Sequence, residues 1–185
     1  MEKTILEVLQ TYQPKDQQEE KDLAVMIDAL YTQNPSFFMR ENPFHFTASA
    51  IVVNQDKSKV LFAFHRIYQS WAWLGGHADG NQNLLEVAKK EVKEESGVQH
   101  LSLYINEPSS IEILDVPEHV KHGKKVASHK HMNVTYLFIA SEEESLRVNE
   151  EENRAVAWLP IESLEQFVSE KEMLPIYQKS LRLLK

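Results

Sequence analysis

The segment from residue 75 to residue 98 constrains the fold of this chain more than any other part. A glycine pair follows the apolar run at 71–74, and the residues after it repeat apolar and acidic side chains at helical spacing. Asn83 is a good N-cap, because its side chain can accept a hydrogen bond from the first helical turn. Gly97 suits the left-handed residue that commonly follows a helix. We therefore predict a strand, a glycine-bearing turn and then a helix that begins at Leu84.

The predicted helix carries two different stripes. Its apolar residues fall on one face, which must pack on the core: Leu85, Ala88 and Val92. Its acidic residues cluster at i, i+3 and i+4 on the neighbouring stripe: Glu91, Glu94 and Glu95. Like charges at this spacing repel each other by about 0.2 to 0.5 kcal/mol, so a counter-charge is expected. Mg²⁺ and Mn²⁺ prefer such oxygen ligands, although an acidic stripe by itself is more often a solvated helix face.

The whole stretch resembles the Nudix box, the signature of the Nudix (MutT-like) hydrolases. The positions that agree with the box keep its spacing throughout: Gly76, Glu91, Val92, Glu94, Glu95, Gly97 and Val98. The two departures are Gln82, where the box has Glu, and Lys90, where it has Arg. A Gln to Lys hydrogen bond lacks the bidentate fork of arginine, so we expect it to brace the loop less firmly.

The resemblance covers about residues 44–169 and implies both a fold and a site. The implied fold class is α/β, a Nudix-type α/β/α sandwich around a mixed β-sheet. The implied catalytic and metal-binding carboxylates are those of Glu91, Glu94 and Glu95, with Mg²⁺ as cofactor, Mn²⁺ as a substitute and the Gly75 carbonyl as a further ligand. Family members take the general base from the box or from a later loop, where Glu152 is the candidate and Glu151 its alternative.

Periodicity divides the chain near residue 43. Residues 1–42 read as an N-terminal helical extension, with apolar residues at helical spacing before and after Pro14. Residues 43–185, the expected Nudix domain, open with two β-rich runs separated by a polar turn at 54–58, which predicts a hairpin. Further strands are expected at 111–116, at 131–140 and through Val156 and Trp158. Two helices should close the chain, one from Pro160 and one from Pro175.

Several histidines are candidates for other roles. The side chains of His129, His131 and Asn133 should share one face of a strand, as His45 and Thr47 should on another, and these residues could contact the substrate. A transition-metal site made by His119 and His122 together with His129 and His131 is an alternative interpretation. The segment between the strands expected at 111–116 and 131–140 is a basic loop. Its lysines could receive phosphates or simply be solvated: Lys121, Lys124, Lys125 and Lys130.

Composition excludes several classes of function. The net charge of -8 argues against a general nucleic-acid binder and against a polybasic membrane binder. The chain has no Cys, which excludes disulfides, thiol nucleophiles and iron–sulfur clusters. The N-terminus lacks the apolar run of a signal peptide, and no later segment approaches the length of a membrane span, so a cytoplasmic location is expected.

The function predicted from these features is metal-dependent hydrolysis of a phosphoanhydride bond in a small molecule. The substrate would be a nucleoside diphosphate linked to another group, or a related pyrophosphate. A non-catalytic Nudix domain that senses a ligand is the alternative, although such domains usually lose box carboxylates. Isopentenyl diphosphate isomerase is excluded because its catalytic Cys has no counterpart. A homodimer through the N-terminal helices also stays open, and an exposed stripe of Leu23, Met26 and Leu30 would support it.

Overall fold

The computed structural model describes residues 3–121 and 123–185. Helices open and close the chain, and one long helix lies in its middle: α1 (Ile5–Thr11), α2 (Gln17–Tyr31), η1 (Pro35–Phe38), α3 (Leu84–Ser96), η2 (Ile161–Gln166) and α4 (Leu174–Leu181). The strands are β1 (Phe44–Val53), β2 (Lys59–His65), β3 (Ser70–Ala72), β4 (Leu74–His77), β5 (Ser102–Leu103), β6 (Ser110–Val116), β7 (His119–Lys121), β8 (Lys124–Val126), β9 (His129–Ile139) and β10 (Asn153–Pro160). None of the helices in these ranges is long and apolar enough to cross a membrane.

The main sheet is mixed and is organised around β1. Its order is β10-β2-β1-β9-β5, with β3 paired to β2, β4 paired to β1 and β6 paired to β9. β1 runs parallel to β9 along their whole length and antiparallel to β2 and β4. The hairpin predicted from the polar turn at 54–58 is therefore confirmed as β1 and β2. Side chains from β1, β4 and β9 can meet on one surface because β4 and β9 both pair with β1.

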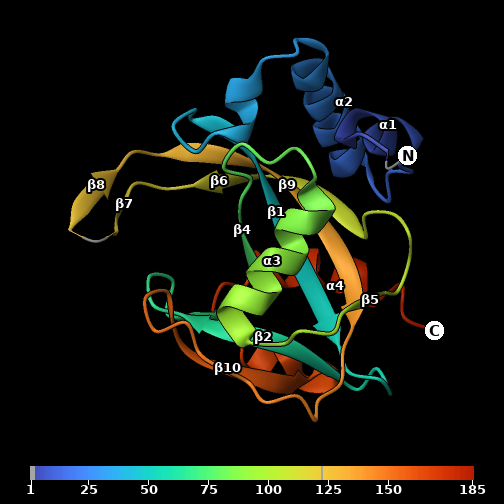
Figure 1. Cartoon of the computed structure of the whole chain (residues 1–185), viewed down its shortest axis with the longest axis vertical. Coiled ribbons are helices and arrows are strands. Elements are labelled where there is room, and N and C mark those ends of the chain that lie inside the picture. Colours follow the sequence, from blue (N-terminus) through green and yellow to red (C-terminus); the bar gives the residue numbers. More distant parts are fainter. Residues whose placement is uncertain (1–2, 122) are drawn as a thin grey trace.

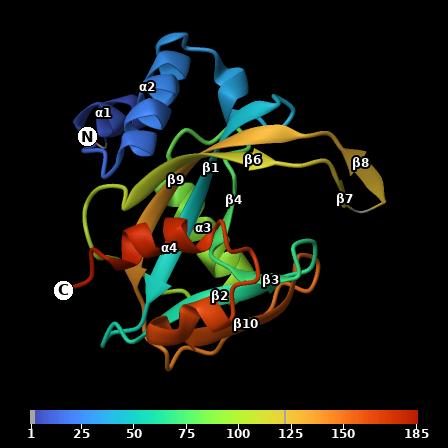
Figure 2. The ribbon, with the colours of Figure 1, turned by 180° about the vertical axis from the view of Figure 1, so that it is seen from behind.

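Helices cover both faces of this sheet. α3 lies on one face (Figure 1), and α4 lies on the opposite face in the reverse view (Figure 2). Two apolar clusters match these layers: one joins α3 and the N-terminal helices to the sheet, and the other joins α4 and η2 to it. The arrangement is the α/β/α sandwich around a mixed sheet that the resemblance implied.

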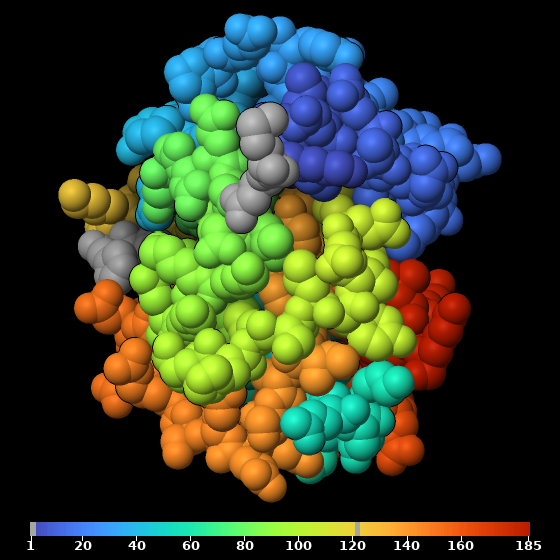
Figure 3. All heavy atoms as spheres, turned by 45° about the vertical axis from the view of Figure 1, so that its right-hand side comes forward, coloured from blue at the N-terminus to red at the C-terminus, as the bar shows by residue number. Residues whose placement is uncertain are grey.

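The helix at the centre of the sequence forms as its end residues predict. The Asn83 side chain accepts a hydrogen bond from the Glu86 N–H at 3.2 Å, and Gly97 takes the left-handed conformation with φ of 81°. Ala88 and Val92 are fully buried, and Leu85 packs at the edge of the same cluster. Figure 3 shows that the outer face of α3, drawn in green, reaches the molecular surface below the blue N-terminal helices.

The region after residue 160 differs from expectation. The helix predicted from Pro160 is wrong as an α-helix, because residues 161–166 form only a short 3₁₀ segment. Ser163 interrupts it with non-helical backbone angles, φ of -125° and ψ of 23°. Leu164 and Val168 are buried nonetheless. The apolar spacing of this segment therefore predicts which residues are buried but not which type of helix they form. The helix predicted from Pro175 is confirmed as α4, and the expected basic loop contains the short hairpin of β7 and β8.

The N-terminal helices pack onto the sheet through both apolar and charged side chains. Met26 is fully buried, and Leu23 and Leu30 pack against the same core, so the stripe expected to favour dimerisation is covered within the chain. Asp22 Oδ2 accepts the Ile113 N–H at 3.0 Å. α2 therefore satisfies a backbone donor of β6, which would otherwise lie unpaired.

Candidate active site

A cleft of about 620 Å³ opens beside β1, β4 and β9 and reaches the inner side of α3. Two sets of polar residues line it. The acidic set with its glycines is Gly75, Gly76, Glu91, Glu95 and Glu152. The second set consists of histidines and neighbouring polar residues: His45, Thr47, Ser49, His77, His129, His131 and Asn133. The structure thus brings most of the residues singled out in the sequence into a single cavity.

Glu95 is held on both carboxylate oxygens. Its Oε1 accepts the Gly75 N–H at 2.8 Å, and its Oε2 accepts the Asn153 side-chain amide at 2.8 Å. The side chain is almost fully buried, and this burial raises its pKa to about 8, against the opposing effect of the two hydrogen bonds. Nearby Glu91 and Glu152 raise the pKa further, because they are like charges.

Glu91 lies directly against the second glycine of the pair. A Cβ placed on Gly76 would come within 2.5 Å of the Glu91 carboxyl carbon, so only glycine leaves room for this carboxylate. Burial raises the pKa of Glu91, and the charges of Glu94 and Glu152 raise it further, while Lys90 lowers it. The helix therefore turns toward the cleft a carboxylate whose pKa is raised even though Lys90 lies beside it.

Glu94 occupies a different environment from its two neighbours. It is about half exposed, does not line the cleft, and pairs with Lys90, whose Nζ lies 3.3 Å from its Oε2. The same Nζ lies 3.6 Å from Glu91 Oε1. Lys90 therefore contacts the box carboxylates in the structure, where the sequence had suggested a contact with Gln82.

Glu152, and not its neighbour Glu151, lines the cleft. Its charge raises the pKa of both Glu91 and Glu95, which means that the three carboxylates are close enough to repel one another. Its backbone is fixed by a hydrogen bond in which Arg66 N–H donates to the Glu152 carbonyl at 3.0 Å. Three carboxylates from two separate elements thus converge on one end of the cavity.

The Gly75 backbone is directed toward α3. Ala78, directly after β4, donates its N–H to the Phe46 carbonyl at 3.2 Å. Counting back from Ala78, every second residue therefore directs its backbone N–H and C=O toward β1, and the residues between them direct these groups away from β1. Gly75 belongs to the second group, because its N–H donates to Glu95. Because the N–H and C=O of a strand residue lie on the same side in an antiparallel pair, the Gly75 carbonyl faces the side of the box carboxylates.

The polar residues on the sheet form a second group. Asn133 accepts the hydroxyls of Thr47 at 3.0 Å and Ser49 at 2.8 Å, and donates to Thr135 at 3.0 Å. Most of its hydrogen-bonding capacity is therefore used within the protein. His45 is buried, whereas His129 and His131 are partly buried, and their rings stand beside one another.

Of the basic residues between 119 and 130, His119 and His129 have ring centroids 6.0 Å apart, and His122 lies outside the described residues. Lys125 pairs with Glu118, and Lys130 pairs with Asp115. The predicted loop site stays untested, because one of its four histidines lies outside the described residues. Within the described residues, His129 and His131 meet His45 and His77.

Two residues of the cleft region were missed in the sequence. Asn153 is fully buried on β10 and donates to Glu95, yet it resembles any polar residue that follows an acidic turn. His77 is next to the glycine pair, but it becomes informative only once β4 is known to pair with β1 opposite Thr47. Of these two residues, only His77 could have been found from the sequence, since it lies two residues after Gly75 and shares its face of a strand.

The adjacent glycines predict a matched pair of variants with opposite effects. In Gly75→Ala the new Cβ would lie 2.6 Å from the Ala48 carbonyl oxygen and 2.9 Å from Ser49 Cα, so backbone must move and stability should fall. In Gly76→Ala the three nearest atoms would all belong to the flexible end of Glu91. We expect Gly76→Ala to melt near the wild-type temperature and to lose activity about 10- to 100-fold through the displaced carboxylate. Thermal unfolding and turnover measured side by side test this, and equal behaviour of the two variants would contradict it.

The raised pKa of Glu95 predicts how stability depends on pH. A carboxyl whose pKa is about 8 in the folded protein and near 4.5 in the unfolded chain favours folding while protonated. That contribution is complete below pH 4.5 and is lost as the pH rises to 8. Glu112, raised to about 7 by burial, adds the same trend. In EDTA, the wild-type melting temperature should fall between pH 5 and pH 8, and Glu95→Gln should fall less; identical slopes would refute the assignment to Glu95.

The fold and the cleft together define the class of protein. They combine an α/β/α sandwich, a glycine pair and a helix that turns carboxylates into a cavity. A model of the NUDIX domain matches residues 43–183, so this chain belongs to the Nudix family. Family membership implies a general reaction class, the hydrolysis of a pyrophosphate bond.

Solved structures share the fold at low sequence identity. A NUDIX-family hydrolase from Clostridium perfringens is 24% identical, with 76% of this chain and 98% of that chain covered and a TM-score of 0.55. The E. coli dihydroneopterin triphosphate pyrophosphohydrolase is 15% identical, with 77% and 97% covered and a TM-score of 0.59. The C. elegans Ap4A hydrolase is 16% identical, with 74% and 95% covered and a TM-score of 0.55. A search of curated proteins found no match.

Proposed function

We propose that this chain is a Mg²⁺-dependent pyrophosphohydrolase whose substrate is a nucleoside diphosphate linked to another group, or a related small diphosphate. The observation that carries the proposal is the convergence of Glu91, Glu95 and Glu152 in one cleft beside Gly75. Carboxylates gathered in this way repel one another, and the pKa values of Glu91 and Glu95 are raised as a result of burial and of that repulsion. The cleft is therefore suited to receive a cation.

The donor set fits a hard divalent cation. The side chains offer carboxylate oxygens, and the Gly75 carbonyl faces the same side, which matches the oxygen ligands that Mg²⁺ and Mn²⁺ prefer. The close fit of Glu91 over Gly76 keeps that carboxylate at the cleft wall. Bound there, Mg²⁺ would neutralise phosphate oxygens and lower the pKa of a water nucleophile. Glu91 and Glu95 would hold it, with Glu94 as a further ligand if its pairing with Lys90 is exchanged.

The residues of the chain divide the remaining tasks. Asn153 and the Gly75 N–H orient Glu95, because each occupies one of its oxygens. Glu152 comes from a different element and lines the same cavity, so its carboxylate is the candidate to accept a proton from the attacking water.

Aromatic side chains in the same cleft support a nucleoside moiety in the substrate. Tyr68 and Trp73 line the cavity, and Tyr68 lies beside His65 with ring centroids 4.6 Å apart. Flat apolar faces of this kind can stack on a nucleobase. His45, His129, His131 and Asn133 remain candidates for contacts to the sugar or base, although the hydrogen bonds of Asn133 leave it little free capacity.

A substrate screen tests the proposal. Nucleotide sugars, dinucleoside polyphosphates, ADP-ribose, coenzyme A and nucleoside triphosphates would each be incubated with the full chain and Mg²⁺ or Mn²⁺, and phosphate-containing products measured. Turnover of at least one diphosphate, abolished by EDTA and reduced in Glu91→Gln, is the expected result. Tight ligand binding without turnover under any condition would favour the alternative, a sensing domain.

The N-terminal segment 1–42 is proposed to be an extension that folds as part of the same unit as residues 43–185. Its support is the shared core, in which Phe38 stacks on Phe46 with ring centroids 5.0 Å apart. Met26 is fully buried and Leu23 and Leu30 are partly buried against the same core, so this stripe of α2 does not itself support a dimer. The cytoplasmic location and the homodimer stay predictions.

A further inference from the structure

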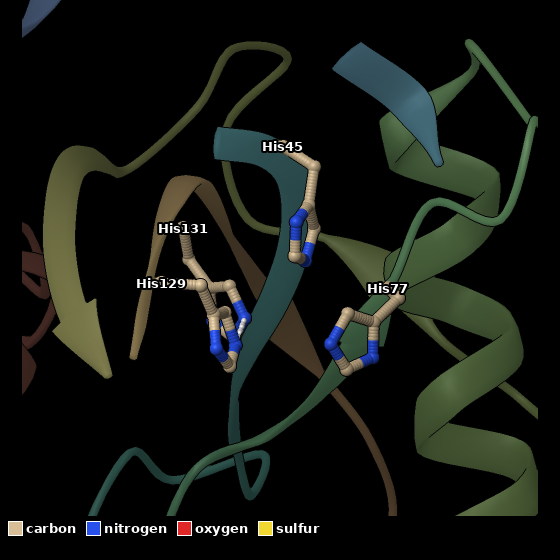
Figure 4. Close-up of side chains that lie close together, drawn as sticks. All are labelled: His45, His77, His129 and His131. Atoms are coloured by element: carbon tan, nitrogen blue, oxygen red, sulfur yellow. Dashed lines mark hydrogen bonds between the residues drawn. The ribbon is translucent and has the colours of Figure 1, made fainter. Parts of the chain in front are cut away.

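Four histidines from three neighbouring strands meet at one side of the cleft. They are His45 on β1, His77 on β4 and the pair His129 and His131 on β9 (Figure 4). One ring nitrogen from each lies within 4.8 Å of the corresponding atom of every other. Sheet pairing creates this meeting, because His45 stands opposite His131 and Thr47 stands opposite His77.

The backbone fixes which nitrogen two of these rings present. His45 Nδ1 lies 2.5 Å from the Asn42 carbonyl oxygen, and His129 Nδ1 lies 2.9 Å from the Ala127 carbonyl oxygen. A carbonyl can only accept, so each Nδ1 carries the proton and each Nε2 is left with a lone pair. A backbone carbonyl bound to the far nitrogen is also the usual arrangement around metal-binding histidines.

One of these lone pairs is buried without a partner. His45 is 1% exposed, and its Nε2 has no hydrogen-bond partner. A buried polar atom left unsatisfied costs free energy, so its retention needs an explanation such as the binding of an ion. Figure 4 shows that the rings of His77, His129 and His131 surround this side of the His45 ring.

The spacing of the rings approaches that of a metal site. A tetrahedral ion with metal–nitrogen bonds of about 2.0 to 2.1 Å holds its ligand nitrogens about 3.3 Å apart. His129 Nε2 and His131 Nε2 lie 3.1 Å apart and share a hydrogen bond, and an ion bound by both rings would replace the shared proton at nearly the same separation. The other pairs, at up to 4.8 Å, need only small ring movements to close on an ion.

We propose that His45, His77, His129 and His131 form a transition-metal site, suited to Zn²⁺ and distinct from the carboxylate site on α3. Imidazole nitrogens select Zn²⁺ and related ions, whereas carboxylate and carbonyl oxygens select Mg²⁺. His77 follows Gly75 by two residues on one strand, which puts the two sites roughly 6 to 7 Å apart along β4. The inference concerns the histidines alone and does not rest on the proposed hydrolysis.

Metal retention by the full chain, without a histidine tag, tests the site. The protein would be stripped with EDTA, given Zn²⁺ or Co²⁺ with millimolar Mg²⁺ to occupy oxygen ligands, passed through a desalting column and its metal content measured. One equivalent should be retained, with the strong visible absorption of tetrahedral Co²⁺. Free Zn²⁺ at 100 times its Kd should raise the melting temperature by roughly 5 to 10 °C.

Variants decide where the ion sits. His131→Ala and His129→Ala should lose the retained metal, and His100→Ala, which changes an exposed histidine elsewhere, should keep it. The triple variant Glu91→Gln, Glu94→Gln and Glu95→Gln should also keep it. If His131→Ala fails to fold by circular dichroism, His129→Ala decides. The proposal is overturned if wild type retains no more Zn²⁺ than the histidine variants, or if the triple variant loses it.

Discussion

Replacing Glu95 by Gln is expected to lower turnover by about 10²- to 10⁴-fold while the protein stays folded, the range for loss of a charge-stabilising or acid–base group. The introduced amide can still accept the Gly75 N–H through its oxygen. Its NH₂ group would face Asn153, whose Oδ1 is buried without a partner, so a flip of the Asn153 amide gives that NH₂ an acceptor. The negative charge is thus removed with little change in hydrogen bonding.

A matched control for this variant lies on the same helix. Glu86 is exposed in the first turn of α3 and pairs with Lys89, so Glu86→Gln should retain the wild-type rate. Turnover of the best substrate from the screen, measured with saturating Mg²⁺, compares the two, and circular dichroism checks the fold. An unchanged rate in Glu95→Gln would remove Glu95 from the reaction.

Lys179→Met should destabilise the protein by about 3 kcal/mol, which for a chain of this size lowers the melting temperature by roughly 6 to 12 °C. Lys179 Nζ lies 3.0 Å from Asp16 Oδ2, 3.5 Å from Glu19 Oε1 and 3.6 Å from Glu112 Oε1. Glu19 and Glu112 are buried, so removal of the lysine leaves two buried carboxylates without their cation. This cluster joins the N-terminal extension to the sheet and to α4.

The loss should also depend on pH. Burial raises the pKa of Glu112 to about 7, and Lys179 opposes that rise. In Lys179→Met the Glu112 carboxyl will therefore keep its proton to a higher pH. Ionising it then costs more, and the difference from wild type should be larger at pH 8 than at pH 5.5. Lys89→Met, which breaks only a surface pair, should change stability by less than about 1 kcal/mol. Equal melting temperatures for both variants would mean that the buried cluster contributes nothing.

Local chemistry explains why much of the fold was predictable. The caps at Asn83 and Gly97 fix α3 to within a residue, and the polar turn at 54–58 fixes the first hairpin. These signals act between residues close in sequence. The segment after Pro160 was predicted less well, because its apolar spacing suits a 3₁₀ turn as well as an α-helix, and the packing of Leu164 and Val168 is satisfied by either.

The site was predictable only where its residues lie on one element. Glu91 and Glu95 share α3, so helical spacing alone brings their side chains together. Asn153 reaches Glu95 from β10, 58 residues away, through a sheet pairing that no local pattern reveals. The histidine group depends in the same way on the pairing of β1 with β4 and β9, which helical or strand spacing within one element does not reveal.

The central claim, that the inner side of α3 holds a divalent cation, is tested most directly by crystals soaked in Mn²⁺ with anomalous diffraction. An ion bound by Glu91 and Glu95 oxygens and the Gly75 carbonyl, at about 2.0 to 2.3 Å, is the predicted result. Crystals that diffract well, contain Mn²⁺ in the solvent and show no anomalous peak within reach of these carboxylates would contradict the account.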